Sequence, residues 1–416
     1  MSPQETRNGP GTAQASPTAT PPNEDSFLPV NKHASSRGPP PTRLGRKQWI
    51  VDRFDWSWFT CTQSTGGIAI ALSKCPKQFD GLQTIGTVIF VLNLALYLLF
   101  CALLVLRWSL QPSTVRRSFT AAPECFFYGS FWLTFATIII GTRQFGGPHA
   151  GPWLVVAVRV CFWVYAAVTL LSTTVHFVVV SRHTELRAIG MNPAWFFLIY
   201  NTMLTGTIAG SVAVDQPPAQ RLPMLVAGVA YQGLGWLVAL LILSLFLGSL
   251  MEKGWPPEAS KAPGLFITVG SAGFTIVALM GCASAAPEDY AFFAAHPLAK
   301  EVLVIMATWI GIFLWLFTLW LFGIAMFVCL AESVSRDGGR LHFPMRFNNT
   351  WWALIFPNVG FTLATIYIGQ SLQSNAIDWV GTVMVVLLVV FWLLDLALMA
   401  KVIALSLFRD SRYSLK

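Results

Sequence analysis

The sequence predicts an all-α polytopic membrane protein in which ten transmembrane helices form five helical hairpins around a central pore. Of its 416 residues, 55% are hydrophobic and only 11% are charged, whereas a soluble domain carries about 25% charged residues. The hydrophobic residues form long uninterrupted blocks, which is typical of segments that lie in a lipid bilayer. The Lys and Arg residues fall between these blocks, as membrane topology requires.

The chain divides into three parts. Residues 1–48 are rich in Pro, Ser, Thr and Gly and contain no apolar stretch, so they predict a disordered cytoplasmic tail. Residues 49–408 form the transmembrane domain, and residues 409–416 form a short cytoplasmic C-terminus. A span needs about 20 apolar residues. We expect spans at 56–73, 82–106, 123–142, 153–180, 194–213, 223–248, 264–283, 300–331, 350–370 and 377–407.

The positions of Lys and Arg predict the orientation. With the N-terminus inside, 20 of these residues fall in inside segments and five in outside loops. Cytoplasmic loops carry the excess of positive charge, so both termini are predicted to be cytoplasmic. An even number of spans is required for this arrangement, and ten satisfies it.

Polar and small residues alternate between successive spans. The first, third, fifth, seventh and ninth spans are rich in Ser, Thr and Gly, whereas the second, eighth and tenth are mostly aliphatic and aromatic. Hydroxyls and glycines gain nothing from contact with hydrocarbon and belong at close helix contacts or on a water-filled path. The pattern predicts odd spans inside and even spans outside. One alternative is that the Gly and Thr residues serve only helix packing, with no pore.

Several function classes are excluded by what the sequence lacks. The net charge of +8 is spread along the chain rather than gathered on one arm, so we expect no nucleic-acid partner. The six His residues show no spacing that holds a metal, and the sequence has neither a P-loop pattern nor a GxSxG elbow. We therefore expect no enzyme activity, no metal and no cofactor.

Short blocks along the chain carry a family resemblance: WSWFTCTQSTGG (56–67), WLVVAVRVCFWVYAAV (153–168), NPAWF (192–196), QPPAQ (216–220), YQGLG (231–235), PGLFITVGSAGF (263–274) and IFPNVGF (355–361). Through them the chain resembles the TDT family of tellurite-resistance and dicarboxylate transporters, and within it the fungal malic acid transport proteins. The resemblance implies a pore lined by odd-numbered helices, a homotrimer with a pore in each protomer, and a Phe in the ninth helix that plugs the pore.

The residue that matches the plug is Phe356. Pro357 follows it and cannot donate the usual helical hydrogen bond, so we expect a kink that frees the aromatic ring to move. Charged residues inside spans are costly and usually functional. Arg159 lies about two turns into the fourth span and is a candidate for binding a substrate carboxylate, or for pairing with a neighbouring helix. Arg143, at a span end, is a candidate for attracting anions at the outer pore mouth, or an ordinary solvated charge.

Small and polar residues of the odd spans complete the candidate site. Gln63 and Thr65 precede a predicted helix break at Gly66 and Gly67, where backbone N–H groups can approach a ligand, and both are candidate substrate contacts. Ser271 is a third, in a similar glycine-rich stretch. The other candidates for pore lining or helix breaks are Gly206, Gly210, Gly270, Gly273 and Asn358.

These expectations combine into a function. The protein is predicted to transport small organic anions, C4 dicarboxylic acids such as malate, succinate or fumarate, across the plasma membrane, with or without an accompanying proton. Two alternatives stay open. One is a passive anion channel or sulfite exporter of the same fold, and the other is a membrane receptor or scaffold without flux.

Overall fold

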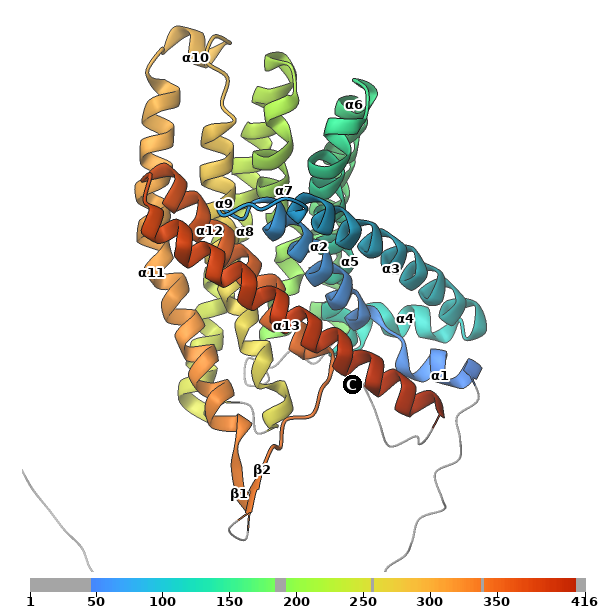
Figure 1. The fold of residues 1–416 in the computed structure, drawn as a ribbon. Helices are drawn as coiled ribbons and strands as arrows, with labels where there is room; N and C mark the ends of the chain where they lie inside the picture. Colours follow the sequence, from blue (N-terminus) through green and yellow to red (C-terminus); the bar gives the residue numbers. More distant parts are fainter. Residues whose placement is uncertain (1–45, 184–191, 256–257, 338–339, 409–416) are drawn as a thin grey trace, which may run out of the picture. The chain divides into compact units, whose positions relative to one another are not determined.

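The computed structural model describes residues 46–183, 192–255, 258–337 and 340–408, which belong to one compact unit (Figure 1). Most of the predicted tail and the predicted C-terminus, 409–416, lie outside these residues. Nine helical segments of the described chain are long and apolar enough to cross a membrane, and they coincide with the second to tenth predicted spans. The protein is therefore an all-α polytopic membrane protein, as predicted.

Five helical segments occupy the predicted odd spans, and each begins with a 3₁₀ segment of three to ten residues. They are η1 (Trp56–Trp58) with α2 (Phe59–Ser73), η2 (Glu124–Phe127) with α5 (Tyr128–Gly141), η6 (Pro193–Phe196) with α7 (Phe197–Val212), η8 (Ala259–Thr268) with α9 (Val269–Ser284), and η9 (Asn349–Leu354) with α12 (Phe356–Ser371). A π-turn, η3 (Thr142–Gly146), and a 3₁₀ turn, η4 (Gly147–His149), extend α5, and η7 (Ala213–Asp215) extends α7. We call these segments the odd helices.

Side-chain caps explain where three of the odd helices begin. Asp55, Asn192 and Asn348 are each in an extended conformation, and each side chain accepts a hydrogen bond from the backbone N–H two residues later. Asp and Asn are favoured at such positions because they satisfy N–H groups that have no partner within the helix.

Five longer helices occupy the even spans. They are α3 (Leu82–Leu110), α6 (Trp153–His183), α8 (Pro218–Lys253), α11 (Ala299–Ser333) and α13 (Asn375–Phe408). Short elements complete the described chain: α1 (Arg46–Arg53), α4 (Ser113–Thr120), α10 (Phe292–Ala295), and an antiparallel pair of strands that the sequence did not predict, β1 (Ser335–Asp337) and β2 (Arg340–His342).

The odd helices lie inside and the even helices outside. Along the chain each odd helix contacts the next one, and α12 contacts α2, which closes a ring of five. In four of the odd segments 67–94% of the most apolar 18-residue stretch is buried, against 22–33% of the corresponding stretch in the five even helices. Even helices instead expose large apolar side chains such as Leu241 and Phe313. The alternation of polarity in the sequence therefore reports which helices face lipid.

The first predicted span, 56–73, is helical throughout but is not among the nine. Its helix α2 has 15 residues, and every one of them is buried. Figure 1 shows α2 between α3 and α13, both of which it contacts. Because neighbouring helices shield α2 completely, it needs no apolar surface for lipid, and it remains short and polar.

Two odd helices, α9 and α12, approach each other closely at Gly273 of α9. A Cβ atom at this position would lie 2.7 Å from the backbone nitrogen of Phe361 and 2.9 Å from the carbonyl carbon of Gly360, both in α12. Backbone atoms cannot move aside without moving the helix, so any larger residue would force α9 and α12 apart. Small residues at such contacts are the usual device for close helix packing in membranes.

We expect Gly273→Ala to destabilise the protein by about 1–3 kcal/mol, the usual cost of overpacking. The matched control is Gly323→Ala in α11, where an added Cβ meets nothing within 4 Å. This control should be neutral, or stabilising by up to about 1 kcal/mol, because Ala favours helix more than Gly does. Size-exclusion chromatography after a heat challenge in detergent measures both variants. Equal heat resistance of the two would contradict the packing argument.

Candidate functional site

The odd helices enclose a pocket near their N-terminal ends, which we call the N-terminal pocket. All five of them contribute to its wall, mostly from the first two turns of the helix. It is lined by Thr60, Gln63, Phe127, Phe197, Tyr200, Leu204, Ile267, Gly270, Phe274, Asn349, Thr350, Ala353, Phe356 and Pro357. The pocket therefore lies where the ring of helices converges, and not between the ring and the outer helices.

The polar groups of the pocket are neutral. None of the residues that line it is charged, but the N-terminal ends of helices carry partial positive charge and unpaired N–H groups, which favour anions. Two side-chain oxygens, Gln63 Oε1 and Asn349 Oδ1, are buried without a hydrogen-bond partner. A buried polar group without a partner is costly, so both amides are suited to a polar ligand.

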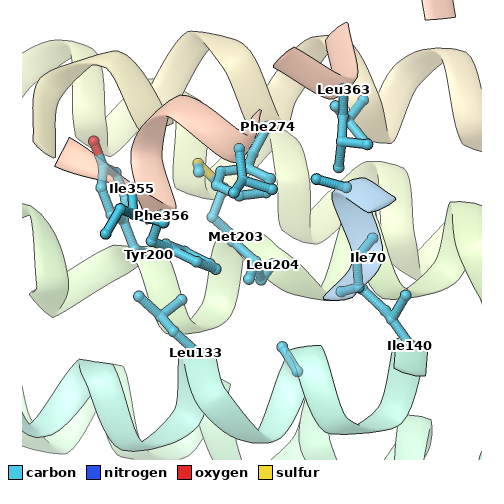
Figure 2. Packing of buried hydrophobic residues seen from close by; sticks show 14 of the residues in the cluster. Ile70, Leu133, Ile140, Tyr200, Met203, Leu204, Phe274, Ile355, Phe356 and Leu363 are labelled. Atoms are coloured by element: carbon cyan, nitrogen blue, oxygen red, sulfur yellow. The ribbon is translucent and has the colours of Figure 1, made fainter. Parts of the chain in front are cut away.

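Two aromatic rings close the pocket. Phe356, the first residue of α12, has its ring centroid 5.0 Å from that of Phe274 in α9, with an angle of 31° between the planes. Figure 2 shows both rings among apolar side chains from neighbouring helices, including Leu133 and Leu204. The cavity volume of the pocket is only about 10 Å³, which is about the room that one water molecule needs. In this conformation the pocket is too small for an organic anion.

Four of the predicted site residues line the N-terminal pocket: Phe356, Pro357, Gln63 and Gly270. The expected kink at Pro357 takes a different form. Ile355 interrupts the helix between η9, which ends at Leu354, and α12, and Pro357 lies in the first turn of α12. In the first turn a missing N–H costs no helical hydrogen bond. Asn358 spans the same junction, since its amide nitrogen donates to the carbonyl oxygen of Leu354 at 2.9 Å.

Thr65 and Ser271 are buried but do not line the pocket. Thr65 Oγ1 donates to the carbonyl oxygen of Cys61 and accepts a hydrogen bond from Trp392 Nε1 of α13. Ser271 Oγ donates to the carbonyl oxygen of Thr268 at 2.8 Å. Both hydroxyls thus already have partners within the protein.

Other hydroxyls of the odd helices are also used between or within helices. Thr62 and Thr134 share a hydrogen bond of 2.9 Å between α2 and α5, and Thr365 accepts one of 2.8 Å from Trp315 of α11. These hydroxyls link neighbouring helices through hydrogen bonds.

The predicted break at Gly66 and Gly67 is absent, because α2 runs without interruption from Phe59 to Ser73. The two glycines instead allow close contacts. A Cβ at Gly66 would lie 2.1 Å from the hydroxyl oxygen of Thr137, and one at Gly67 would lie 3.2 Å from the ring of Phe356. Gly67 therefore makes room for the aromatic closure rather than breaking the helix.

Gly206 and Gly210 also lie within a continuous helix, α7. A Cβ at Gly206 would lie 2.6 Å from the side-chain oxygen of Gln232 in α8, and one at Gly210 would lie 3.0 Å from the backbone of α9. Gly273 makes the contact with α12 described above. These three glycines serve helix contacts.

The two candidate arginines lie apart from the N-terminal pocket. Arg159 is on the outer helix α6, half-buried, with no hydrogen bond or ion pair to the described residues. Arg143 is in η3, which extends α5 beyond its C-terminal end, and it forms an ion pair with Asp215 of η7. Neither residue lines the pocket.

A second cluster of polar residues lies around Arg143, which we call the C-terminal mouth. Lys74 caps the end of α2, and its charge interacts with those of Arg143 and Asp215. Arg221, in the first turns of α8, also interacts electrostatically with Asp215, and Tyr367 of α12 interacts electrostatically with Arg143. Four odd helices therefore bring charged or polar groups together at the ends opposite to the N-terminal pocket.

Sequence reasoning missed several residues of the pocket. Phe274, Tyr200 and Asn349 line it but were not predicted to do so. The available signal was position, because each lies near the beginning of an odd helix, as Phe356 and Gln63 do. Within the described residues, no group of three His, Cys, Asp or Glu side chains is placed to hold a metal ion.

The sequence was compared with those of known proteins. The model of the family described as SLAC1, voltage-dependent anion channel, matches residues 53–400. The chain belongs to this family. It is 32% identical to a malic acid transport protein of Schizosaccharomyces pombe over 84% of this chain and 78% of the relative. A sulfite efflux pump of Trichophyton rubrum is 28% identical over 85% of this chain and 92% of the pump.

More distant relatives share the length of the SLAC1 domain. An uncharacterized transporter of Methanocaldococcus jannaschii is 24% identical over 87% of this chain and 99% of the relative. The family and these relatives are membrane transporters and channels rather than enzymes. This member of the SLAC1 family is therefore a multi-pass membrane protein that transports anions.

Proposed function

We propose that this protein carries C4 dicarboxylates, malate first among them, through the axis of the ring of odd helices. The observation that carries the proposal is the convergence of five helix N-terminal ends on one uncharged pocket. Partial charges from helix ends attract an anion without the strong binding that a full counter-charge would cause, so the anion can leave again. The malic acid transport protein among the relatives supports malate as the substrate.

The neutral amides of the pocket suit malate in particular. Malate presents a hydroxyl group and two carboxyl groups, and an amide side chain can either donate or accept a hydrogen bond. Gln63 and Asn349 approach the pocket from α2 and η9, so one ligand can contact both. In this proposal Gln63 is the substrate contact that the sequence predicted, and Asn349 is its partner.

Phe356 is the proposed gate. Its ring and that of Phe274 lie against each other in the lining of the pocket, and the remaining space holds about one water molecule. A dicarboxylate can therefore pass only after the rings move. Gly67 lies on one side of Phe356 and leaves little further space there, since a Cβ would already be 3.2 Å from the ring. In this proposal the ring of Phe356 opens the path by swinging away from Phe274 and out of the axis.

A second candidate substrate is sulfite, because a sulfite efflux pump matches nearly its whole length to this chain. A substrate panel in proteoliposomes separates the candidates. We expect labelled malate and succinate to enter faster than sulfite, nitrate or chloride. Faster sulfite flux would favour the second candidate, and equal flux of all anions would favour a passive channel. Absence of any flux from correctly folded protein would favour a receptor or scaffold.

We expect Gln63→Leu to raise the KM for malate about tenfold, because a hydrogen bond to a charged group contributes about 1.5–3 kcal/mol. Gln232→Leu is the matched control. Gln232 is as deeply buried, but it lies on the outer helix α8 and donates to Thr275 rather than lining the pocket. Initial rates of malate uptake over a concentration series measure both variants. An equal change in KM for the two would contradict the contact with Gln63.

The remaining proposals concern the setting of the protein. We propose that both termini are cytoplasmic, in a plasma membrane, so that the N-terminal pocket faces the cytoplasm and the C-terminal mouth faces outward. The preponderance of Lys and Arg in the inside segments supports this orientation. The homotrimer implied by the family resemblance is the proposed assembly. Native mass spectrometry, and labelling of single cysteines in intact cells, test the assembly and the orientation respectively.

A further inference from the structure

The ion pair between Arg143 and Asp215 has the geometry with which arginine binds a carboxylate. Arg143 Nε donates to Asp215 Oδ2 at 2.5 Å, and Arg143 Nη2 donates to Asp215 Oδ1 at 2.9 Å. Both carboxylate oxygens are thus held by one guanidinium group, which is the strong bidentate arrangement. A carboxylate of a substrate would use the same two donors.

The C-terminal mouth carries more positive than negative charge. Three cations, Lys74, Arg143 and Arg221, each interact electrostatically with the carboxylate of Asp215. Burial, and then the neighbouring Arg143 guanidinium, lower the pKa of Lys74 from its ordinary value. With Asp215 counted, the cluster has an excess of two positive charges, which matches the charge of a dicarboxylate.

The fold makes this position suitable for a carboxylate. The odd helices end here, and helix C-termini carry partial negative charge, which repels anions. Full positive charges are needed to offset that effect, whereas the N-terminal pocket at the other end needs none. Lys74 and Arg143 follow the ends of two odd helices, and Asp215 follows a third.

The ion pair is also easy to open. The side chains of Arg143 and Asp215 are 26% and 39% exposed, so water and solutes can reach both groups and replace either one as the partner of the other. Asp215 lies in a single 3₁₀ turn between α7 and α8. It can therefore leave Arg143 without disturbing either helix.

We propose that Arg143, Lys74 and Arg221 form a carboxylate-binding site at the C-terminal mouth, which Asp215 occupies until a substrate carboxylate displaces it. This inference rests on the proposed transport of dicarboxylates. One carboxylate of the substrate replaces Asp215 on Arg143, and the second lies near Lys74. Such a site favours dicarboxylates over monocarboxylates and delivers them to the axis of the ring.

The test uses the full chain in detergent and in proteoliposomes, with malate and lactate as probes. Asp215→Asn keeps the size of the side chain but removes the competing charge, so malate should bind about threefold to tenfold more tightly. Arg143→Gln should weaken malate binding about tenfold or more and lactate binding less. The reason is that malate has a second carboxylate, which also loses the attraction of the positive charge, whereas lactate has only one. Calorimetric titration measures binding, and uptake rates measure transport.

The matched control is Glu288→Gln. Glu288, which lies between α9 and α10, forms an ion pair with Lys300 of α11 at 2.8 Å, and neither residue belongs to the cluster around Arg143. This change also removes one negative charge, so it tests whether charge alone explains the effect. It should leave malate binding unchanged. A double variant, Arg143→Gln with Asp215→Asn, should bind malate no better than Arg143→Gln alone, because the competition requires Arg143.

The outcomes separate this inference from the proposed function. Wild-type protein that neither binds nor transports malate overturns the transport proposal and this inference together. Wild-type protein that transports malate, with Asp215→Asn equal to Glu288→Gln or weaker in binding, overturns the inference alone. Asp215→Ser serves as a second variant if the Asn variant is poorly folded, and the melting temperature of each variant distinguishes lost binding from lost structure.

Discussion

Replacement of Phe356 by Ala is expected to raise malate flux at least about tenfold. The ring is 4% exposed and pairs with Phe274 in the closed arrangement. Loss of a buried Phe side chain costs about 3–5 kcal/mol, and each 1.4 kcal/mol changes an equilibrium about tenfold. The ring stabilises the closed state, so its removal destabilises that state relative to the open state, which becomes more populated.

Uptake of labelled malate into proteoliposomes, normalised to the amount of folded protein, measures the effect. The control is Phe266→Ala, which removes an equally buried ring that faces Phe322 of the outer helix α11 instead of lining the pocket. This control should lose stability without gaining flux. Phe274→Ala should raise flux as well, because it removes the ring against which Phe356 packs. Unchanged flux in Phe356→Ala, beside normal folding, would contradict the gate.

The arrangement of the helices was predictable because lipid and protein surroundings demand different residues. Helices that face lipid must be apolar around most of their surface, and the blocks at 82–106 and 300–331 are. Helices shielded by others can retain hydroxyls and glycines, which is why α2 is polar and completely buried. Composition along each span therefore suffices to tell the inner ring from the outer helices.

The direction of each side chain was not predictable from composition. Thr65 and Gln63 are two residues apart on α2, yet Gln63 lines the pocket while Thr65 accepts a hydrogen bond from α13. A ring of five helices surrounded by others presents polar groups to several neighbours, and only the rotation of each helix decides which group reaches the axis. The pattern of polar residues therefore identifies the inner helices but not which of their side chains line the pocket.

Glycines posed a similar ambiguity. A glycine pair in a helix indicates either a break or a close contact, and both use the absence of a Cβ atom. At Gly66 and Gly67 the structure shows contacts with Thr137 and Phe356. Which use a glycine pair serves depends on the helix that packs against it in the folded protein. The sequence alone could therefore not distinguish the two uses.

The second large effect concerns a charge that the sequence analysis counted only toward topology. Arg107, near the end of α3, is 1% exposed and forms an ion pair with Glu124 of η2. It also donates to Ser118 Oγ at 3.0 Å and to the carbonyl oxygen of Val51 at 3.2 Å. This buried network joins α3, the segment before α5, and the short helices α1 and α4.

Glu124→Ala is expected to destabilise the protein by about 3–5 kcal/mol, because it leaves a guanidinium group buried without its counter-charge. The double change Arg107→Met with Glu124→Leu should recover most of that loss, since well-packed apolar side chains can replace a buried ion pair at little cost. The partly exposed pair of Arg143 and Asp215 offers the contrast, because water can solvate the guanidinium group that Asp215→Asn leaves without its counter-charge, so this change should cost less stability than Glu124→Ala. Melting temperatures and folded yields of the four proteins, wild type included, measure these differences. A double variant as unstable as Glu124→Ala would show that the ion pair itself, and not the cost of an unpaired charge, holds this end of the ring together.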